Sequence, residues 1–139
     1  MHLPDVNVWL ALAFEAHAHH GRAVTWFESA KTDAVAFCRF TQHGFLRIAT
    51  NPKAFGDETL STSGAWSAYE DLLNDPRVRF AAEPATTEGI WREITSARPH
   101  SSRVWGDAYL AAFARAGELA VVSFDRDFEA FKGVTWIRP

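Results

Sequence analysis

The sequence predicts one α/β domain, a central parallel sheet of about five strands flanked by helices. Short apolar runs alternate with longer amphipathic ones along the chain, which is typical of this class. The length of 139 residues suits one domain, and the 47% of hydrophobic residues can fill one core. No repeat or low-complexity tract interrupts the alternation, so we expect residues 1–139 to fold as a unit.

The apolar runs predict the strands, which we place at residues 2–5, 33–37, 78–82, 119–123 and 134–137. The amphipathic segments predict helices at residues 7–16, 20–31, 39–50, 62–74, 86–97 and 104–116, with a short turn at 126–131. Pro52 and Gly56 in "NPKAFG" predict a loop after the third helix. Gly117 follows "DAYLAAFARA", where we expect a left-handed helix cap.

Charge and cysteine content narrow the class of protein. The net charge of −3 gives the chain as a whole no electrostatic footprint for nucleic acid. Residues 89–103 are locally basic, with Arg92, Arg98 and Arg103 as candidate phosphate contacts. The single Cys38 excludes an internal disulfide, and neither a signal peptide nor a membrane span is predicted. We therefore expect a cytoplasmic protein with no membrane partner.

Three aspartates are predicted to meet at one edge of the sheet. Asp5 ends the first strand, and Asp125 follows the fourth strand in "VVSFDRDF". Asp107 shares an apolar helical stripe with Leu110 and Ala111, so its side chain should point inward. Carboxylates that converge repel one another unless a cation compensates, and Mg²⁺ or Mn²⁺ prefers such oxygen ligands.

Each aspartate also has a simpler interpretation. Asp5 could only cap the following helix, which is worth about 1 kcal/mol. Asp107 could complement a helix dipole, and Asp125 could open a turn. One metal site accounts for all three more economically. The histidines of "HAHH" are a weaker metal candidate because they lie in a loop without a fourth ligand of the same type.

The segments "PDVNVWLALA", "WGDAYLAAFA", "VSFDRDF" and "GVTWIRP" resemble those of PIN-domain ribonucleases, specifically VapC-type toxins of bacterial toxin–antitoxin pairs. The resemblance covers nearly the whole chain. It implies a PIN fold and a metal-dependent endoribonuclease that cleaves RNA phosphodiester bonds in-line. It also implies a VapB-type antitoxin that neutralises the toxin, and a homodimer.

Site residues carry over by the same resemblance. Asp5, Asp107 and Asp125 match the catalytic, metal-binding acids, and Asp127 matches an auxiliary metal-binding acid. Supporting contacts are expected from three further positions, namely Asn7, Thr41 and Ser123.

One position departs from the family pattern. The family usually carries a Glu early in the third helix, where "RFTQHGFLR" places Gly44. Helical spacing puts Gly44 on an inner stripe with Thr41 and Phe45, so we expect a water-filled space there and tighter metal binding in Gly44→Glu. The missing carboxylate leaves a second interpretation open, a PIN-fold protein that binds RNA or antitoxin without cutting.

Overall fold

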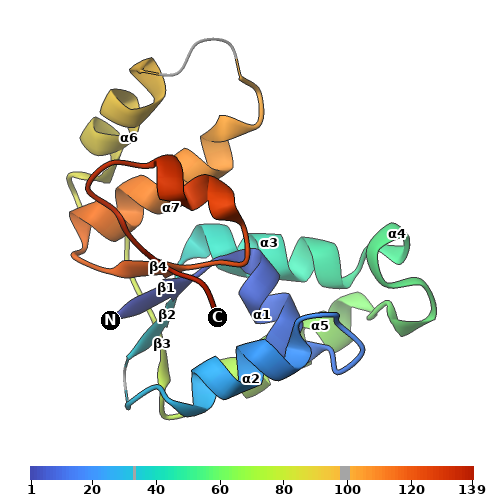
Figure 1. Ribbon diagram of the computed structural model, residues 1–139. Coiled ribbons are helices and arrows are strands. Elements are labelled where there is room, and N and C mark those ends of the chain that lie inside the picture. The colour runs from blue at the N-terminus through green and yellow to red at the C-terminus, as the bar shows by residue number, and fades with distance from the viewer. Residues whose placement is uncertain (33, 98–100) are drawn as a thin grey trace.

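The computed structural model describes residues 1–32, 34–97 and 101–139. Within them, one sheet contains five strands, all parallel, in the order β3-β2-β1-β4-β5 (Figure 1). The strands are β1 His2–Pro4, β2 Val35–Phe37, β3 Val78–Phe80, β4 Ala120–Val122 and β5 Thr135–Ile137. The predicted parallel sheet is confirmed. Asp33, where the predicted second strand began, lies outside the described residues.

The helices follow the predicted segments closely. They are α1 Val6–Ala13, α2 His20–Glu28, α3 Arg39–Ala49, α4 Pro52–Phe55, α5 Thr62–Leu73, α6 Thr87–Ser96 and α7 Val104–Ala116, with 3-10 turns η1 Gly56–Glu58 and η2 Arg126–Ala130. None of the helices in the described part of the chain has both the length and the hydrophobicity needed to cross a bilayer.

The predicted loop at "NPKAFG" is wrong, because Pro52–Phe55 form the short helix α4. The side chain of Asn51 accepts a hydrogen bond from the Lys53 backbone N–H at 3.0 Å, which caps the helix. Proline at the first helical position costs nothing, since that N–H would be unpaired anyway. Gly56 then adopts φ 54° and ends the helix.

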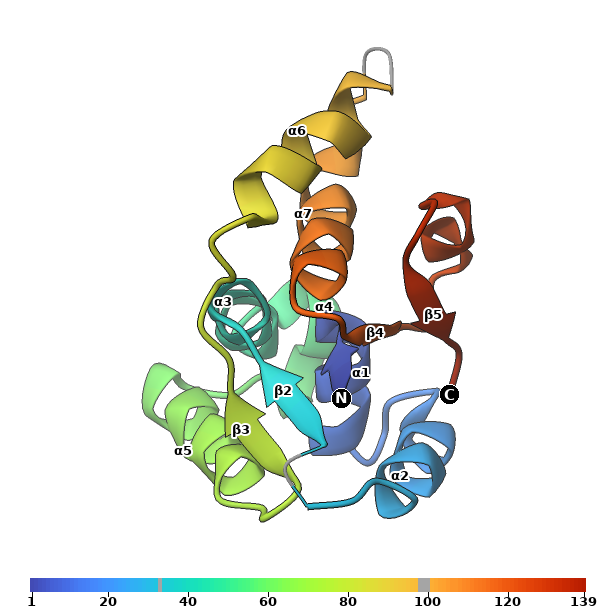
Figure 2. The ribbon, with the colours of Figure 1, turned by 90° about the vertical axis from the view of Figure 1, so that its left-hand side faces the viewer.

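The sheet separates two helical layers, and successive residues of β2 show why. Ala36 joins Leu3 and Val121 in a core with the inner face of α7, whereas Val35 and Phe37 face a second core. That second core contains residues of α1, α2, α3 and α5, and Trp9 stacks on Phe37 with ring centroids 3.6 Å apart. Figure 2 shows α6 and α7 rising together from the first face, away from α2 and α5.

The end of α7 differs from the prediction at Gly117. Gly117 has φ −94°, and the left-handed residue is Glu118 with φ 54°. The Leu119 N–H donates to the Ala114 carbonyl at 2.8 Å, the bond that defines a Schellman motif with Glu118 in the position that glycine usually fills. The sequence indicates the correct end of the helix but assigns the left-handed conformation one residue too early.

Candidate functional site

The carboxyl ends of β1 and β4 form the candidate site. The two strands are neighbours, with Pro4 opposite Val122, so the residues that follow them emerge side by side. Asp5 follows β1, and Ser123 and Asp125 follow β4. In an open parallel sheet, ligands bind outside the carboxyl ends of the strands where the order reverses, and β1 and β4 flank such a reversal.

Asp5 is held by three donors. Its Oδ1 accepts from the Val6 N–H at 2.7 Å, and its Oδ2 accepts from Asn7 Nδ2 at 2.8 Å and from the Ser123 hydroxyl at 2.9 Å. Asp5 is also the N-cap residue of α1. The two interpretations of this aspartate are therefore compatible, because one carboxylate both starts the helix and lies in the acidic site.

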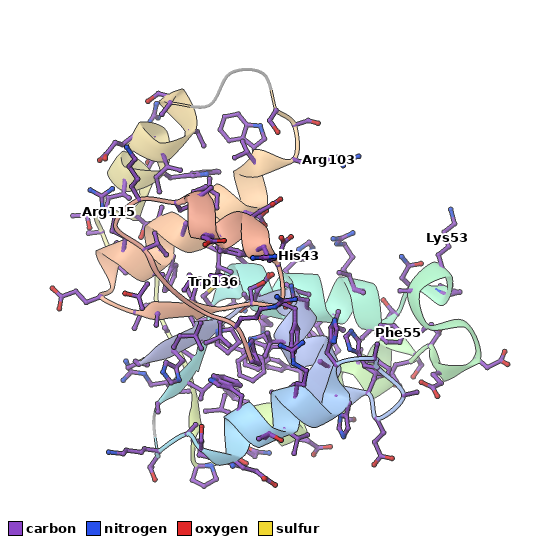
Figure 3. The ribbon with its side chains drawn as sticks, in the orientation of Figure 1. His43, Lys53, Phe55, Arg103, Arg115 and Trp136 are labelled. Atoms are coloured by element: carbon purple, nitrogen blue, oxygen red, sulfur yellow. The ribbon has the colours of Figure 1, made fainter. Side chains whose placement is uncertain are left out.

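Asn7 and Ser123, predicted as supporting residues, connect the segments that follow β1 and β4. Asn7 Nδ2 donates to Ser123 Oγ at 3.0 Å, and the same hydroxyl accepts the Asp125 N–H at 3.0 Å. Sequence analysis missed Trp136 of β5, whose Nε1 donates to the Ser123 carbonyl at 3.1 Å (Figure 3). No periodic pattern predicts this contact, because it depends on β5 lying beside β4.

Three carboxylates gather within reach of one ion. Asp107, Asp125 and Asp127 each offer an oxygen within 4.8 Å of the others, and no other compact group of His, Cys, Asp and Glu occurs in the described residues. Asp107 comes from the first turn of α7, and the Asp127 N–H donates to Asp125 Oδ1 at 2.9 Å. Asp5, predicted as a ligand, lies outside this compact group, although its charge acts on Asp107 and the charge of Asp125 acts on it. We call Asp5 and these three residues the acidic cluster.

The electrostatics of the acidic cluster favour a cation. Burial, followed by the charges of Asp5, Asp125 and Asp127, raises the pKa of Asp107 from 3.8 to about 6. Burial also raises the pKa of Asp5, although the hydrogen bonds from Ser123 and Val6 act in the opposite direction. Clustered carboxylate oxygens of this kind fit Mg²⁺ or Mn²⁺ and not a soft metal.

The raised pKa of Asp107 predicts how stability changes with pH. Because the folded pKa lies above 3.8, the contribution of Asp107 to stability is complete below about pH 4 and is lost as pH rises through about 6. In metal-free buffer, Asp107→Asn should therefore unfold at a higher temperature than wild type at roughly pH 8, with a smaller difference at roughly pH 4.5. Thermal unfolding at both pH values measures this.

Asp57→Asn is the matched control, since Asp57 is exposed and lies outside the acidic cluster. Added Mn²⁺ should raise the unfolding temperature of wild type more than that of Asp107→Asn. Equal melting temperatures of Asp107→Asn and wild type at the higher pH would contradict the raised pKa.

The predicted RNA-binding arginines do not lie together at one site. Arg103 lines a cavity of about 190 Å³ together with Asp107 and Asp127 of the acidic cluster. Arg92 lies on α6 and forms an ion pair with Glu88 at 2.6 Å. It lines a different cavity of about 630 Å³, together with Trp91 and Trp105. Arg98 lies outside the described residues. The structure thus brings Arg103, but not Arg92, to the acids.

Thr41 lies beside Cys38 and has no hydrogen bond to an aspartate among the described residues. Its hydroxyl accepts the Cys38 N–H at 3.1 Å and donates to the Cys38 carbonyl, so it fixes the start of α3. Cys38 itself is fully buried, and burial raises the pKa of its thiol.

The expected space beside Gly44 does not exist. Gly44 is buried on the inner face of α3 as predicted, but a Cβ there would lie 2.5 Å from Val6 Cγ2. Val6 follows Asp5 directly, so α3 packs against the first turn of α1 at this point. The glycine permits close contact between the helices, and neither water nor a carboxylate has room.

Comparisons with known proteins identify the family of this chain. The PIN-domain family model matches residues 3–134. Ribonuclease VapC41 of Mycobacterium tuberculosis (strain H37Rv) is 40% identical over 139 residues, covering 96% of this chain and 95% of the relative. Ribonuclease VapC38 of the same strain is 47% identical over 133 residues, covering 90% and 85%.

Two solved structures share the fold. The crystal structure of M. tuberculosis VapC20, a Sarcin-Ricin loop cleaving toxin, has a TM-score of 0.74 at 22% identity and covers all of both chains. VapBC2 of Rickettsia felis, bound to a DNA fragment from its promoter, has a TM-score of 0.68 at 9% identity, covering 99% and 97%. With a family model that spans nearly the whole chain and relatives this similar along most of their length, the chain belongs to the PIN-domain family and, within it, to the VapC ribonucleases.

Proposed function

We propose that this protein is an endoribonuclease toxin that hydrolyses RNA phosphodiester bonds with Mg²⁺ or Mn²⁺ at the acidic cluster. The observation that carries the proposal is the meeting of Asp107, Asp125 and Asp127 within 4.8 Å, beside an Asp5 that three donors hold in place. The relatives named as ribonucleases support the RNA substrate.

The residues in and around the acidic cluster have separate proposed roles in metal binding, positioning and phosphate binding. Asp5, Asp107 and Asp125 would hold a divalent cation, and Asp127 would support them. When bound, the cation would supply a water of lowered pKa and would neutralise charge that develops on the phosphate. Ser123 and Asn7 fix the orientation of Asp5, and Ser123 also fixes the backbone that carries Asp125. Arg103 in the adjoining cavity attracts an RNA phosphate.

We also propose a VapB-type antitoxin as the partner, with the toxin present as a homodimer. Support for the antitoxin comes from structural neighbours that are toxin–antitoxin complexes, including VapBC2 of R. felis and VapBC of Salmonella typhimurium. An RNA substrate and an antitoxin that binds promoter DNA would place the protein in the cytoplasm.

Cleavage that depends on a divalent metal tests the proposed function. Purified protein incubated with a panel of structured and single-stranded RNAs should cut at least one of them with Mg²⁺ or Mn²⁺. Excess chelator should abolish the cut, and restored Mn²⁺ should return it, because the carboxylates alone cannot activate water. Product ends carrying a 5′-phosphate and a 3′-hydroxyl are expected from in-line hydrolysis. Cleavage that persists in chelator would remove the metal from the proposal.

The second candidate function is a PIN-fold protein that binds RNA or antitoxin without cutting. Gly44 favours it, because the carboxylate that the family usually carries on α3 is absent and Val6 fills its space. Under this alternative, RNA binds with the same affinity in chelator and in Mn²⁺ and stays intact in both. Anisotropy and gel analysis of the same samples therefore discriminate between the two functions.

A further inference from the structure

Helix α3 forms one wall beside the acidic cluster. Its first turn meets α7, because a Cβ on Gly106 would lie 3.0 Å from Phe40 Cζ, next to Asp107. Its second turn meets α1 at Val6, next to Asp5. The outward face of α3 therefore lies next to the acidic cluster.

This outward face and the following helix carry unpaired basic side chains. His43 and Arg47 are exposed and lie one turn apart on α3, and Lys53 is exposed on α4. None of the three forms an ion pair within the described chain, unlike Arg77, Arg92 and Arg115. In Figure 3, Lys53 lies at the right of the molecule, toward which the strands run, His43 and Arg103 lie nearer the middle, and Arg115 lies at the left.

A pocket with an aromatic wall adjoins two of these basic side chains, His43 and Arg47. A cavity of about 230 Å³ between α3 and α5 is lined by His43, Arg47 and Trp66, with Leu46, Thr50, Thr62 and Ala65. The side chain of Trp66 is 48% exposed. Among the described residues, its one contact with another aromatic ring is with Tyr69, edge-on, with ring centroids 5.9 Å apart. A large indole left in water beside two basic side chains is unusual for a residue that serves the core alone.

We propose that this pocket binds one nucleotide of single-stranded RNA that flanks the scissile phosphate. The base stacks on Trp66, Arg47 and His43 contact its phosphate, and Lys53 contacts the next phosphate along the strand. The inference rests on the proposed ribonuclease function and deepens it by giving the path of the RNA strand. The strand runs from Arg103, across the acidic cluster and along α3 to α4.

The chemistry favours RNA over other occupants. Stacking on an exposed aromatic ring beside cations is how proteins hold single strands without reading their sequence. The pocket is smaller than a typical drug-sized ligand site, as one planar base requires. The larger groove between α6 and α7 is a poorer phosphate site, because Glu83 and Glu88 line it and Glu88 already pairs with its arginine. Arg47 also complements the dipole of α3, a role that leaves its guanidinium available.

Binding of a mixed-sequence single-stranded RNA, measured by fluorescence anisotropy in chelator so that cleavage cannot occur, tests the pocket. Trp66→Ala should weaken binding about tenfold, whereas Trp66→Phe, which keeps a stacking ring, should retain most of the affinity. Arg47→Glu and Lys53→Glu should each weaken binding and reduce the slope of log K against log salt by about one. Lys31→Glu is the matched control, since Lys31 is exposed before β2, at the opposite edge of the sheet.

The outcomes separate this inference from the proposed function. Wild type that neither binds nor cuts RNA overturns both. Wild type that binds and cuts, with Trp66→Ala and Arg47→Glu binding equally well, overturns the pocket alone. If these variants instead change the sedimentation of the protein, or its capture of a VapB-type peptide, with RNA affinity unchanged, the face is a protein interface and the inference is wrong. Thermal unfolding of Trp66→Ala and Arg47→Glu near that of wild type excludes a folding defect as the cause of lost affinity.

Discussion

Asp5→Asn, Asp107→Asn and Asp125→Asn should each reduce RNA cleavage more than about a hundredfold, because even loss of a contact that supports a metal ligand costs about 10- to 100-fold. Each substitution removes a proposed metal ligand from a set that already lacks a carboxylate from α3. Asparagine retains the shape of the side chain, so the hydrogen bonds of Asp5 to Val6 and Ser123 can persist. Asp127→Asn should reduce cleavage less, since the proposal gives Asp127 only an auxiliary role.

Initial rates of cleavage at saturating Mn²⁺ measure these effects, with Asp57→Asn as the exposed control. Circular dichroism and thermal unfolding establish that each variant is folded, and Asp107→Asn should be at least as stable as wild type at neutral pH. A folded variant that cuts at the wild-type rate would remove its residue from the metal site. Ser123→Ala is expected to be intermediate, since it loosens Asp5 and the Asp125 backbone without removing a ligand.

Gly44→Glu should destabilise the protein by about 3 kcal/mol, from overpacking and from a carboxylate buried without a partner. Its Cβ alone would lie 2.5 Å from Val6 Cγ2, and valine has few rotamers into which it can move. This result is opposite to the stabilisation expected from helix propensity, which favours residues other than glycine by about 1 kcal/mol. Denaturant unfolding measures the change.

A double-mutant cycle identifies the cause of this destabilisation. Gly44→Ala tests the contact with the smallest side chain, and Val6→Ala removes the methyl group that it meets. Combined, the two substitutions should destabilise by less than the sum of their separate effects, with a coupling of about 1 kcal/mol. Strict additivity would mean that α1 and α3 relax apart at little cost. In that case Gly44→Glu could reach the acidic cluster, and a gain in Mn²⁺ affinity by calorimetry would show it.

The sequence by itself determined the fold class and most of the acidic cluster. Alternation of apolar and amphipathic segments predicts the strands and the longer helices, because strands and helices bury side chains at different periods. The position of Asp125 after a strand and of Asp107 on the inner stripe of α7 predicts that these two meet, and Asp5 follows the neighbouring strand at the same edge. Local turn chemistry did not predict the left-handed residue after α7, because Glu118 takes the conformation expected at Gly117.

Only the tertiary structure decided which neighbours surround those acids. Trp136 reaches the Ser123 carbonyl because β5 lies beside β4, and Arg103, but not Arg92, lines the cavity at Asp107 and Asp127. Helical spacing correctly puts Gly44 on the inner face of α3, but it cannot tell an empty space from one filled by Val6. Periodicity within one segment fixes the direction of a side chain, whereas the atom that it meets depends on the packing of a second segment far away in the sequence.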